Sequence, residues 1–278
     1  MNKSQQGNEF SLKGKSILVS GALGLIGREV CDAFACYGAK VILGDILDEK
    51  LIREYAAQIS QKYDTQTLGL YLDISSVQSI ENSIEQIRAV GLDIDVYVHL
   101  AAIDAKFDDN INEIVPSAFE DFPHAAWLKS VDVNINGTFY AIQCAIREML
   151  KKKGGGVITV ASTYSLVAPN QRLYRKRGEP RQLYKPIDYV ATKSILPNFT
   201  RYLATYYGAR GIRANCIVPH GVFNGHDDEF VANFSELSPL GRMCDVKELR
   251  GLFVFLASDA ASYMTGSTLV VDGGWTAW

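Results

Sequence analysis

The chain has 278 residues, of which 47% are hydrophobic and 21% charged, so it can bury one sizeable core and is short for two full domains. Its formal net charge of −3 excludes a general electrostatic attraction to nucleic acid or to an anionic membrane surface. The longest apolar runs are far too short to span a bilayer. We therefore expect one soluble domain over residues 1–278, with neither nucleic acid nor membrane as a partner.

The first fifteen residues are polar and lack the apolar core of a signal peptide, which predicts a cytoplasmic protein. The five cysteines show no Cys-x-x-Cys spacing and no histidine-rich neighbourhood, so we expect buried, reduced thiols and no metal site. These cysteines are Cys31, Cys36, Cys144, Cys216 and Cys244.

Strand-like and helix-like segments alternate along the chain. Strands are expected at 16–20, 40–44, 68–72, 95–100, 157–161, 213–218 and 267–271. Helices are expected at 24–37, 48–62, 76–90, 127–150, 189–207 and 246–257. Residues 101–125 and 166–188 show no regular period. The alternation predicts an α/β fold with a doubly wound parallel sheet of about seven strands and helices on both faces.

The segment from Ser16 to Asp45 combines a strand, a glycine-rich turn, a helix and a second strand. Gly21, Gly24 and Gly27 let the turn approach an anion closely, and the free N–H groups of the following helix can bind a dinucleotide pyrophosphate. Asp45 follows the second strand, where an acid can accept the ribose hydroxyls. Its charge would repel a 2′-phosphate, which favours NAD over NADP. Arg28 at the start of the helix leaves that choice open.

The Tyr189-x-x-x-Lys193 spacing puts a phenol and an ammonium group on one face of a helix. A nearby cation favours the phenolate form of a tyrosine, which makes the phenol a better proton shuttle near neutral pH. The bare pattern is also common in ordinary helices, where it is structural.

These motifs resemble the short-chain dehydrogenase/reductase family from Lys13 to Gly274. The resemblance implies a single Rossmann-type domain that interconverts alcohol and carbonyl groups by hydride transfer with a nicotinamide cofactor. The matching segments are Gly21/Gly24/Gly27, Asp45, Asp73-Ile74, residues 99–102, 133–137 and 157–162, Tyr189/Lys193, residues 215–219 and residues 255–274.

The resemblance also implies a role for each matching residue. Tyr189 would be the general acid/base, and Ser162 would hydrogen-bond the reacting oxygen, with Thr163 as an alternative hydroxyl. Lys193 would lower the pKa of Tyr189 and hold the nicotinamide ribose, and Asn134 would anchor Lys193 through a water. Asp73 would contact adenine or, alternatively, only cap a strand end. The full implied cofactor set is Gly21, Gly24, Leu25, Ile26, Gly27, Asp45, Asp73, Ile74, Ala101, Ala102, Tyr189, Lys193, Pro219, Gly221 and Val222.

Three features resemble the extended, nucleotide-sugar branch of the family: the G-x-x-G-x-x-G spacing, the His99-Leu-Ala-Ala102 strand end, and the 27 residues between Ser162 and Tyr189. The ending at 272–274 matches compact members. We therefore expect the compact architecture with an enlarged basic substrate loop at 166–187.

That loop carries six basic residues and one acid, Glu179, a local excess of five positive charges. Guanidinium groups suit phosphate and carboxylate, so the loop predicts an anionic substrate; a solvated charge run is the alternative. His220 is either a substrate contact or an ordinary loop residue. The candidate substrate contacts are Ser162, Thr163, Arg172, Arg175, Arg177 and His220.

The C-terminal stretch 266–278 resembles bacterial reductases of flagellin modification and surface-sugar biosynthesis, which implies a phosphorylated or nucleotide-linked sugar substrate. A neutral ketone or a 3-oxoacyl compound is the enzymatic alternative. A cofactor-binding regulator without turnover is a further alternative, although such relatives usually lose one of the four catalytic residues. Family resemblance also implies a homo-oligomer, a tetramer or a dimer, formed through the helices at 127–150 and 189–207 and the C-terminal strand region.

Overall fold

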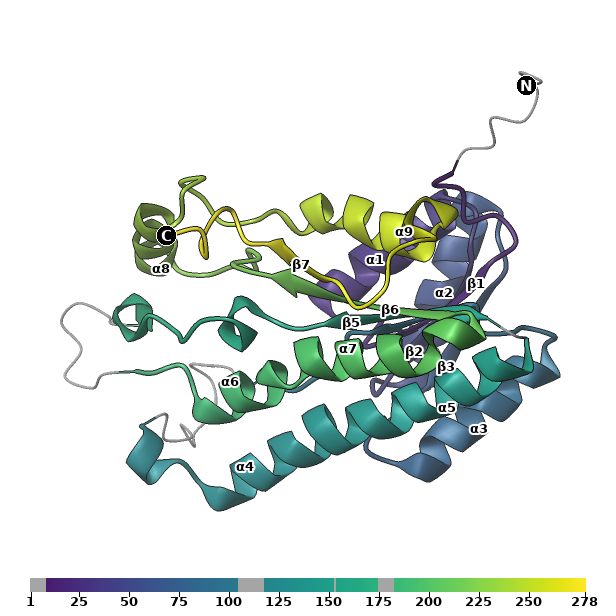
Figure 1. The fold of residues 1–278 in the computed structure, drawn as a ribbon, viewed down its shortest axis with the longest axis horizontal. Coiled ribbons are helices and arrows are strands. Elements are labelled where there is room, and N and C mark those ends of the chain that lie inside the picture. Colours follow the sequence, from purple (N-terminus) through teal and green to yellow (C-terminus); the bar gives the residue numbers. More distant parts are fainter. Residues whose placement is uncertain (1–8, 105–117, 153, 175–182) are drawn as a thin grey trace.

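The computed structural model describes residues 9–104, 118–152, 154–174 and 183–278. These residues form one seven-stranded parallel sheet with the strand order β3-β2-β1-β4-β5-β6-β7 (Figure 1). The strands are β1 (Ser16–Ser20), β2 (Lys40–Asp45), β3 (Thr67–Tyr71), β4 (Val96–His99), β5 (Gly155–Val160), β6 (Ile212–Pro219) and β7 (Thr268–Val271). The predicted Rossmann-type fold is confirmed.

The central strands are apolar because helices cover both faces of the sheet. One layer holds α1 (Leu25–Cys36), α2 (Glu49–Tyr63) and α9 (Arg250–Ala257), and its core includes Phe34 and Phe253. The opposite layer holds α3 (Val77–Ala89), α5 (Thr138–Lys151) and α7 (Leu196–Tyr207).

The strand register brings the carboxyl ends of the central strands together. Ser20 pairs with Gly44 of β2 on one side and with His99 of β4 on the other. The chain runs outward from β1 to β3 and then returns to the other side of β1, so β1 and β4 border the point where the strand order reverses. Ligands of open α/β sheets bind at such a point.

Two expected helices are interrupted. The predicted helix at 127–150 begins earlier, as α4 (His124–Val131), and passes through a π-helical turn at Asp132–Gly137 before α5. The predicted helix at 189–207 is divided into α6 (Ile187–Ser194) and α7, with Ile195 between them. Pro197 in the first turn of α7 lacks an N–H donor, which explains the break.

Helix α8 (Asp228–Leu237) was not predicted, although its apolar residues Phe230, Val231, Phe234 and Leu237 recur at helical spacing after the N-cap residue Asp227. It lies beyond the carboxyl ends of the strands, near the C-terminus (Figure 1). Smaller differences concern short 3₁₀ turns at Gln171–Tyr174 and Val246–Leu249, within segments expected to be irregular and helical respectively.

The expectation of five buried thiols is wrong for two of them. Cys31, Cys144 and Cys216 are buried, whereas Cys36 is exposed and Cys244 half-buried. Cys36 is the last residue of α1, where the helix leaves the sheet. Within the described residues, no helix is both long and apolar enough to cross a membrane.

Candidate active site

A cavity of about 460 Å³ opens at the carboxyl ends of the central strands. Its walls come from the glycine turn after β1, the segments that follow β4, β5 and β6, and helices α6 and α8. The expected site residues that line it are Gly21, Gly24, Leu25, Ile26, Gly27, Ala102, Ser162, Tyr189, Lys193, Pro219, His220, Gly221 and Val222.

The glycine turn has the shape of an anion cradle. A β-carbon at Gly27 would lie 2.1 Å from the carbonyl oxygen of Gly21, and one at Gly21, whose φ is +72°, would lie 2.8 Å from the amide nitrogen of Ala101. Gly24 at the start of α1 has no side chain to cap the helix. The first N–H groups of α1 thus face the cavity without a capping side chain, which fits a dinucleotide pyrophosphate.

Asp45 lies at the end of β2 and is almost fully buried. One of its carboxylate oxygens accepts a hydrogen bond from the backbone N–H of Leu23 (2.8 Å), and the other accepts one from the N–H of Leu47 (3.2 Å). The nearby cation Arg28 is engaged elsewhere: it donates to the carbonyl oxygen of Leu23 (3.0 Å) and lies over the Tyr55 ring. Asp45 therefore presents a fixed negative charge beside the glycine turn.

Several further expected residues, Asp73, Ile74, Ala101 and Asn134 among them, do not line the cavity. Asp73 accepts hydrogen bonds from the N–H and hydroxyl groups of Ser75, so in this structure it caps the end of β3. Ile74 is buried against α3 and α5, and Ala101 packs behind Gly21.

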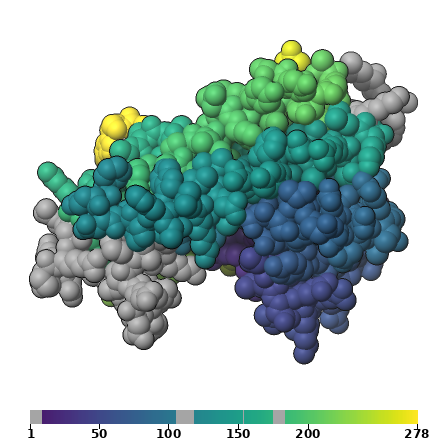
Figure 2. Space-filling view, turned by 90° about the horizontal axis from the view of Figure 1, so that it is seen from below, coloured from purple at the N-terminus to yellow at the C-terminus, as the bar shows by residue number. Residues whose placement is uncertain are grey.

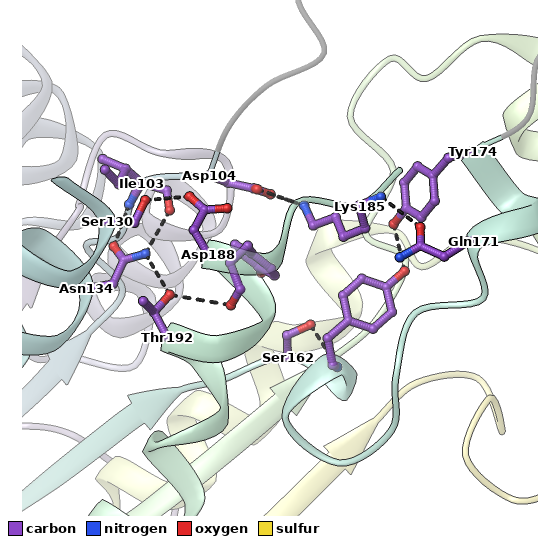
Figure 3. Close-up of polar contacts among 12 residues, drawn as sticks. Ile103, Asp104, Ser130, Asn134, Ser162, Gln171, Tyr174, Lys185, Asp188 and Thr192 are labelled. Atoms are coloured by element: carbon purple, nitrogen blue, oxygen red, sulfur yellow. Dashed lines mark hydrogen bonds and ion pairs between the residues drawn. The ribbon is translucent and has the colours of Figure 1, made fainter. Parts of the chain in front are cut away.

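Asn134 lies in the π-helical turn and connects two walls of the site (Figure 3). Its side-chain oxygen accepts from the N–H of Ile103 (2.8 Å), while its amide nitrogen donates to the carbonyl oxygen of Ile103 (2.9 Å) and to the hydroxyl of Thr192 (3.1 Å). Asn134 therefore holds the segment after β4 against α6. The π turn is the local feature that aims this side chain, as such turns often do at functional sites.

Buried polar groups form hydrogen bonds with the π turn. The hydroxyl of Thr138 donates to the carbonyl oxygen of Asn134 (2.6 Å) and bonds Nε2 of His99 (2.8 Å). Burial lowers the pKa of His99 to about 3, so its ring is neutral at physiological pH. The end of β4 is thus connected to Asn134 through hydrogen bonds.

Tyr189 and Lys193 lie one turn apart on α6, and both face the cavity. The ammonium of Lys193 donates to the carbonyl oxygen of Val160 (2.9 Å) and lies 5.9 Å from the Tyr189 ring centroid. Because Lys193 is buried, its pKa is lowered to about 8.

The pKa of Tyr189 is raised, because the phenol is desolvated and the carboxylate of Asp104 lies near; a hydrogen bond with Ser162 acts in the opposite direction. A lowering of this pKa by Lys193 stays a prediction. Tyr189 is therefore a neutral phenol at physiological pH and holds a proton that it can donate.

The two neighbouring hydroxyls, Ser162 and Thr163, are separated by the fold. Ser162 follows β5 and lines the cavity, and its oxygen accepts from the N–H of Tyr164 (3.2 Å). Thr163 has no exposed surface, and its hydroxyl bonds Nδ1 of His220. The hydroxyl that a substrate can reach is that of Ser162.

Comparison with known proteins agrees with this arrangement. A family model described as enoyl-(acyl carrier protein) reductase matches residues 21–276. The NAD-dependent glycerol dehydrogenase of Listeria innocua is 30% identical over 273 residues, which cover 96% of this chain and 96% of the relative. A solved short-chain type dehydrogenase/reductase from Mycobacterium marinum is 29% identical, with a TM-score of 0.80 over 97% of this chain and 98% of the other. The chain belongs to the short-chain dehydrogenase/reductase family.

A second solved structure extends the range of cofactors and ligands among these dehydrogenase/reductases. The gluconate 5-dehydrogenase of Burkholderia cenocepacia, in complex with NADP and tartrate, has a TM-score of 0.83 and 25% identity, over 97% of this chain and 98% of that one. Family membership makes this chain an NAD(P)-dependent oxidoreductase of alcohol and carbonyl groups.

The expected basic loop is only partly within the described residues of this dehydrogenase/reductase. Arg175 and Arg177 lie outside them. Arg172 is exposed and does not line the cavity, so this structure does not place it in contact with a bound substrate. Lys185, from the same charge run, does line the cavity.

Sequence reasoning missed several cavity residues of this dehydrogenase/reductase. Asp104 and the aromatic residues come from segments without periodicity, which gave no signal. The hydroxyls of Tyr164 and Tyr174 bond each other at 2.7 Å, and Phe234 packs against His220 and Trp275. The missed lining residues are Asp104, Tyr164, Leu173, Tyr174, Asn224, His226, Phe230, Phe234 and Met243. Among the described residues, no group of three histidine, cysteine or acidic side chains is placed to bind a metal.

The arrangement can move a proton at one oxygen atom. A bound nicotinamide cofactor would supply or accept a hydride in this cavity. A substrate oxygen between Ser162 and Tyr189 would receive hydrogen bonds from both hydroxyls, and Tyr189 would donate its proton to that oxygen or remove it. The buried Lys193 places a positive charge beside the oxygen, where negative charge develops.

Proposed function

We propose that this dehydrogenase/reductase uses NAD(H), in preference to NADP(H), to interconvert a ketone and a secondary alcohol on an anionic sugar or polyol. The observation that carries the proposal is the convergence of Ser162, Tyr189 and Lys193 with the glycine turn in one cavity. A phosphorylated or nucleotide-linked sugar of bacterial surface-glycan or flagellin-modification metabolism is the substrate class we favour, since the C-terminal stretch resembles such reductases.

Two kinds of support bear on the substrate. The relatives with glycerol and gluconate in their names act on small polyhydroxylated compounds, one of them an anion. The cavity itself offers hydroxyl, imidazole and amide groups from Tyr164, Tyr174, His226 and Asn224, which can hydrogen-bond several substrate hydroxyls.

Support for NAD comes from Asp45. Its buried carboxylate lies beside the glycine turn, and the cation Arg28 at the start of α1 bonds the carbonyl oxygen of Leu23 and lies over the Tyr55 ring. A 2′-phosphate at this place would meet an unneutralised negative charge.

One experiment tests the function. Phosphorylated sugars, nucleotide-linked sugars, gluconate and neutral polyols are screened with NAD and with NADP by nicotinamide absorbance. We expect kcat/KM to be at least tenfold higher with NAD. On the best substrate, Tyr189→Phe should lower kcat by a factor of about 10²–10⁴, because the proton shuttle is lost. Tyr37→Phe, at an exposed position directly after α1, is the matched control. Wild-type kcat in Tyr189→Phe would refute the mechanism.

A second candidate is reduction of a 3-oxoacyl compound, which the description of the matching family model favours. Acetoacetyl-coenzyme A joins the same screen as its probe. A kcat/KM for this thioester above that of every sugar would replace our substrate proposal and leave the mechanism intact.

We further propose that the protein forms a homo-oligomer through α5 and α7. Phe139 on α5 and Tyr202 and Tyr206 on α7 are exposed, and the two helices lie side by side on one face of the molecule (Figure 2). Large exposed apolar side chains on neighbouring helices are typical of protein interfaces.

A further inference from the structure

An ion pair that the reaction does not require joins Asp104 and Lys185 (Figure 3). The ammonium of Lys185 lies 2.7 Å and 2.6 Å from the two carboxylate oxygens of Asp104. Asp104 belongs to the segment after β4 that Asn134 holds, and Lys185 lies two residues before α6. The pair therefore joins opposite walls of the cavity, and both residues line it.

The ammonium of Lys185 lies close to Tyr189, the tyrosine that would transfer the proton. This ammonium is 4.1 Å from the centroid of the Tyr189 ring, closer than the ammonium of Lys193 at 5.9 Å. The backbone N–H of Lys185 donates to the side-chain oxygen of Gln171 (2.9 Å), which fixes the start of this side chain. The ammonium therefore lies in the same cavity as the proton-transferring phenol, within a few ångström of its ring.

The two partners of the pair differ in exposure. The side chain of Lys185 is 9% exposed, whereas that of Asp104 is 41% exposed. A buried ammonium needs an anion beside it, because desolvation strongly disfavours an isolated charge. The side chain of Asp104 is partly exposed, while desolvation raises the pKa of its carboxyl group and so disfavours its charged form. Asp104 is thus the partner that another anion can replace.

Lys185 is the cation of the cavity that is available to bind a substrate anion. The cationic side chains among its described lining residues are Lys185 and Lys193. The ammonium of Lys193 is committed to the carbonyl oxygen of Val160 and to the proton transfer at Tyr189. Lys185 is the cation whose partner is a replaceable carboxylate.

We propose that Lys185 determines substrate specificity: its ammonium binds a carboxylate or phosphate on a carbon adjacent or close to the reacting carbon, and Asp104 holds this ammonium until that anion replaces it. The inference rests on the proposed function, because it assigns to one residue the anion recognition that the proposed function requires. An ion pair that only joins the cavity walls is the alternative.

Matched substrate pairs test the inference. Gluconate is paired with sorbitol, and glycerol 3-phosphate with glycerol, because the members of each pair differ in the anionic group. For wild type we expect a lower KM for the anionic member. Lys185→Met keeps the length of the side chain and removes its charge, and should raise the ratio of anionic to neutral KM by a factor of about ten or more. Lys50→Met, at an exposed site on α2, should leave the ratio unchanged.

Substitution of the other partner should act in the opposite direction. Asp104→Asn removes the competing carboxylate, so the KM for gluconate and glycerol 3-phosphate should fall by a factor of about three or more. A purely structural ion pair would be weakened by either substitution, and both variants would then impair anionic and neutral substrates alike. That result, or an unchanged KM ratio in Lys185→Met, overturns the inference.

Isothermal titration calorimetry tests whether Lys185 binds the anionic group, without any need for turnover. Wild type saturated with NADH should bind gluconate or glycerol 3-phosphate more tightly than sorbitol or glycerol, and Lys185→Met should lose that preference. Equal binding of charged and neutral members by wild type overturns the inference. Tyr189→Phe separates the two proposals: retained preference for anions with no turnover supports both, whereas full turnover refutes the proposed mechanism and leaves Lys185 as the anion site.

Discussion

Lys193 keeps an ammonium group in a place that water hardly reaches. Burial lowers its pKa to about 8, from an ordinary 10.5, so at pH 7 the folded protein maintains a charge that its surroundings disfavour. The hydrogen bond to the carbonyl oxygen of Val160 compensates only part of this cost. A buried charge that lowers the stability of the folded protein is typical of an active site.

We predict that Lys193→Met is inactive and more stable than wild type at pH 7 by about 1–3 kcal/mol. A pKa of about 8 in the folded state and 10.5 in the unfolded state means that the unfolded chain binds more protons between these values. Wild type should therefore gain stability as the pH rises from 8 to 10.5, and the advantage of Lys193→Met should shrink.

Urea denaturation of both proteins at intervals from pH 7 to 10.5 measures this difference. Lys50→Met, which removes an exposed ammonium from α2, should follow wild type within about 0.5 kcal/mol. A Lys193→Met variant less stable than wild type at pH 7, or a difference that does not change with pH, would contradict the prediction.

At the scale of elements, the close packing of α1 against the glycine turn makes one glycine irreplaceable. A β-carbon at Gly27 would lie 2.1 Å from the backbone carbonyl oxygen of Gly21 and 2.8 Å from the carbonyl carbon and oxygen of Ala22, and backbone atoms cannot move aside as a flexible side chain can. Helix and turn would have to separate, and the anion cradle would lose its shape.

Gly27→Ala should therefore lower the free energy of unfolding by about 2 kcal/mol or more and raise the Kd for NADH at least tenfold. Gly251→Ala is the matched control, because a β-carbon at Gly251 in α9 meets no atom within 4 Å. This control should be as stable as wild type or more stable, by up to about 1 kcal/mol, with unchanged NADH binding. Urea denaturation and NADH fluorescence titration give both quantities. Equal behaviour of the two variants would show that the turn tolerates a side chain.

For the whole molecule, the proposed homo-oligomer can be tested directly by its molecular mass. Light scattering should give a mass of two or four times 30.7 kDa. Tyr206→Glu, which places a charge on the exposed face of α7, should reduce that mass at micromolar concentration, because an uncompensated carboxylate would be buried in the interface. Tyr263→Glu, on the fully exposed turn after α9, is the control and should not change it. A monomeric wild type would refute the oligomer.

Much of the fold could be predicted because its signals are local. The alternation of apolar strands with amphipathic helices predicts a parallel sheet, and all seven strands lie at the expected places to within one or two residues. Helix α8 was overlooked although its N-cap residue Asp227 and its apolar spacing are local signals. The π turn around Asn134 could not be predicted, because it depends on a contact between distant segments: Thr138 bonds His99.

The sequence by itself determined the family, the glycine turn and the helical spacing of Tyr189 and Lys193, because each is a pattern of neighbouring residues whose geometry follows from one element. Only the tertiary structure decided which hydroxyl reaches the cavity, that burial raises the pKa of Tyr189, and that Asp104 and Lys185 meet. These outcomes depend on burial and on pairs of residues far apart in the chain, 81 positions for Asp104 and Lys185. Neither composition nor periodicity specifies such pairs, because loops bring them together.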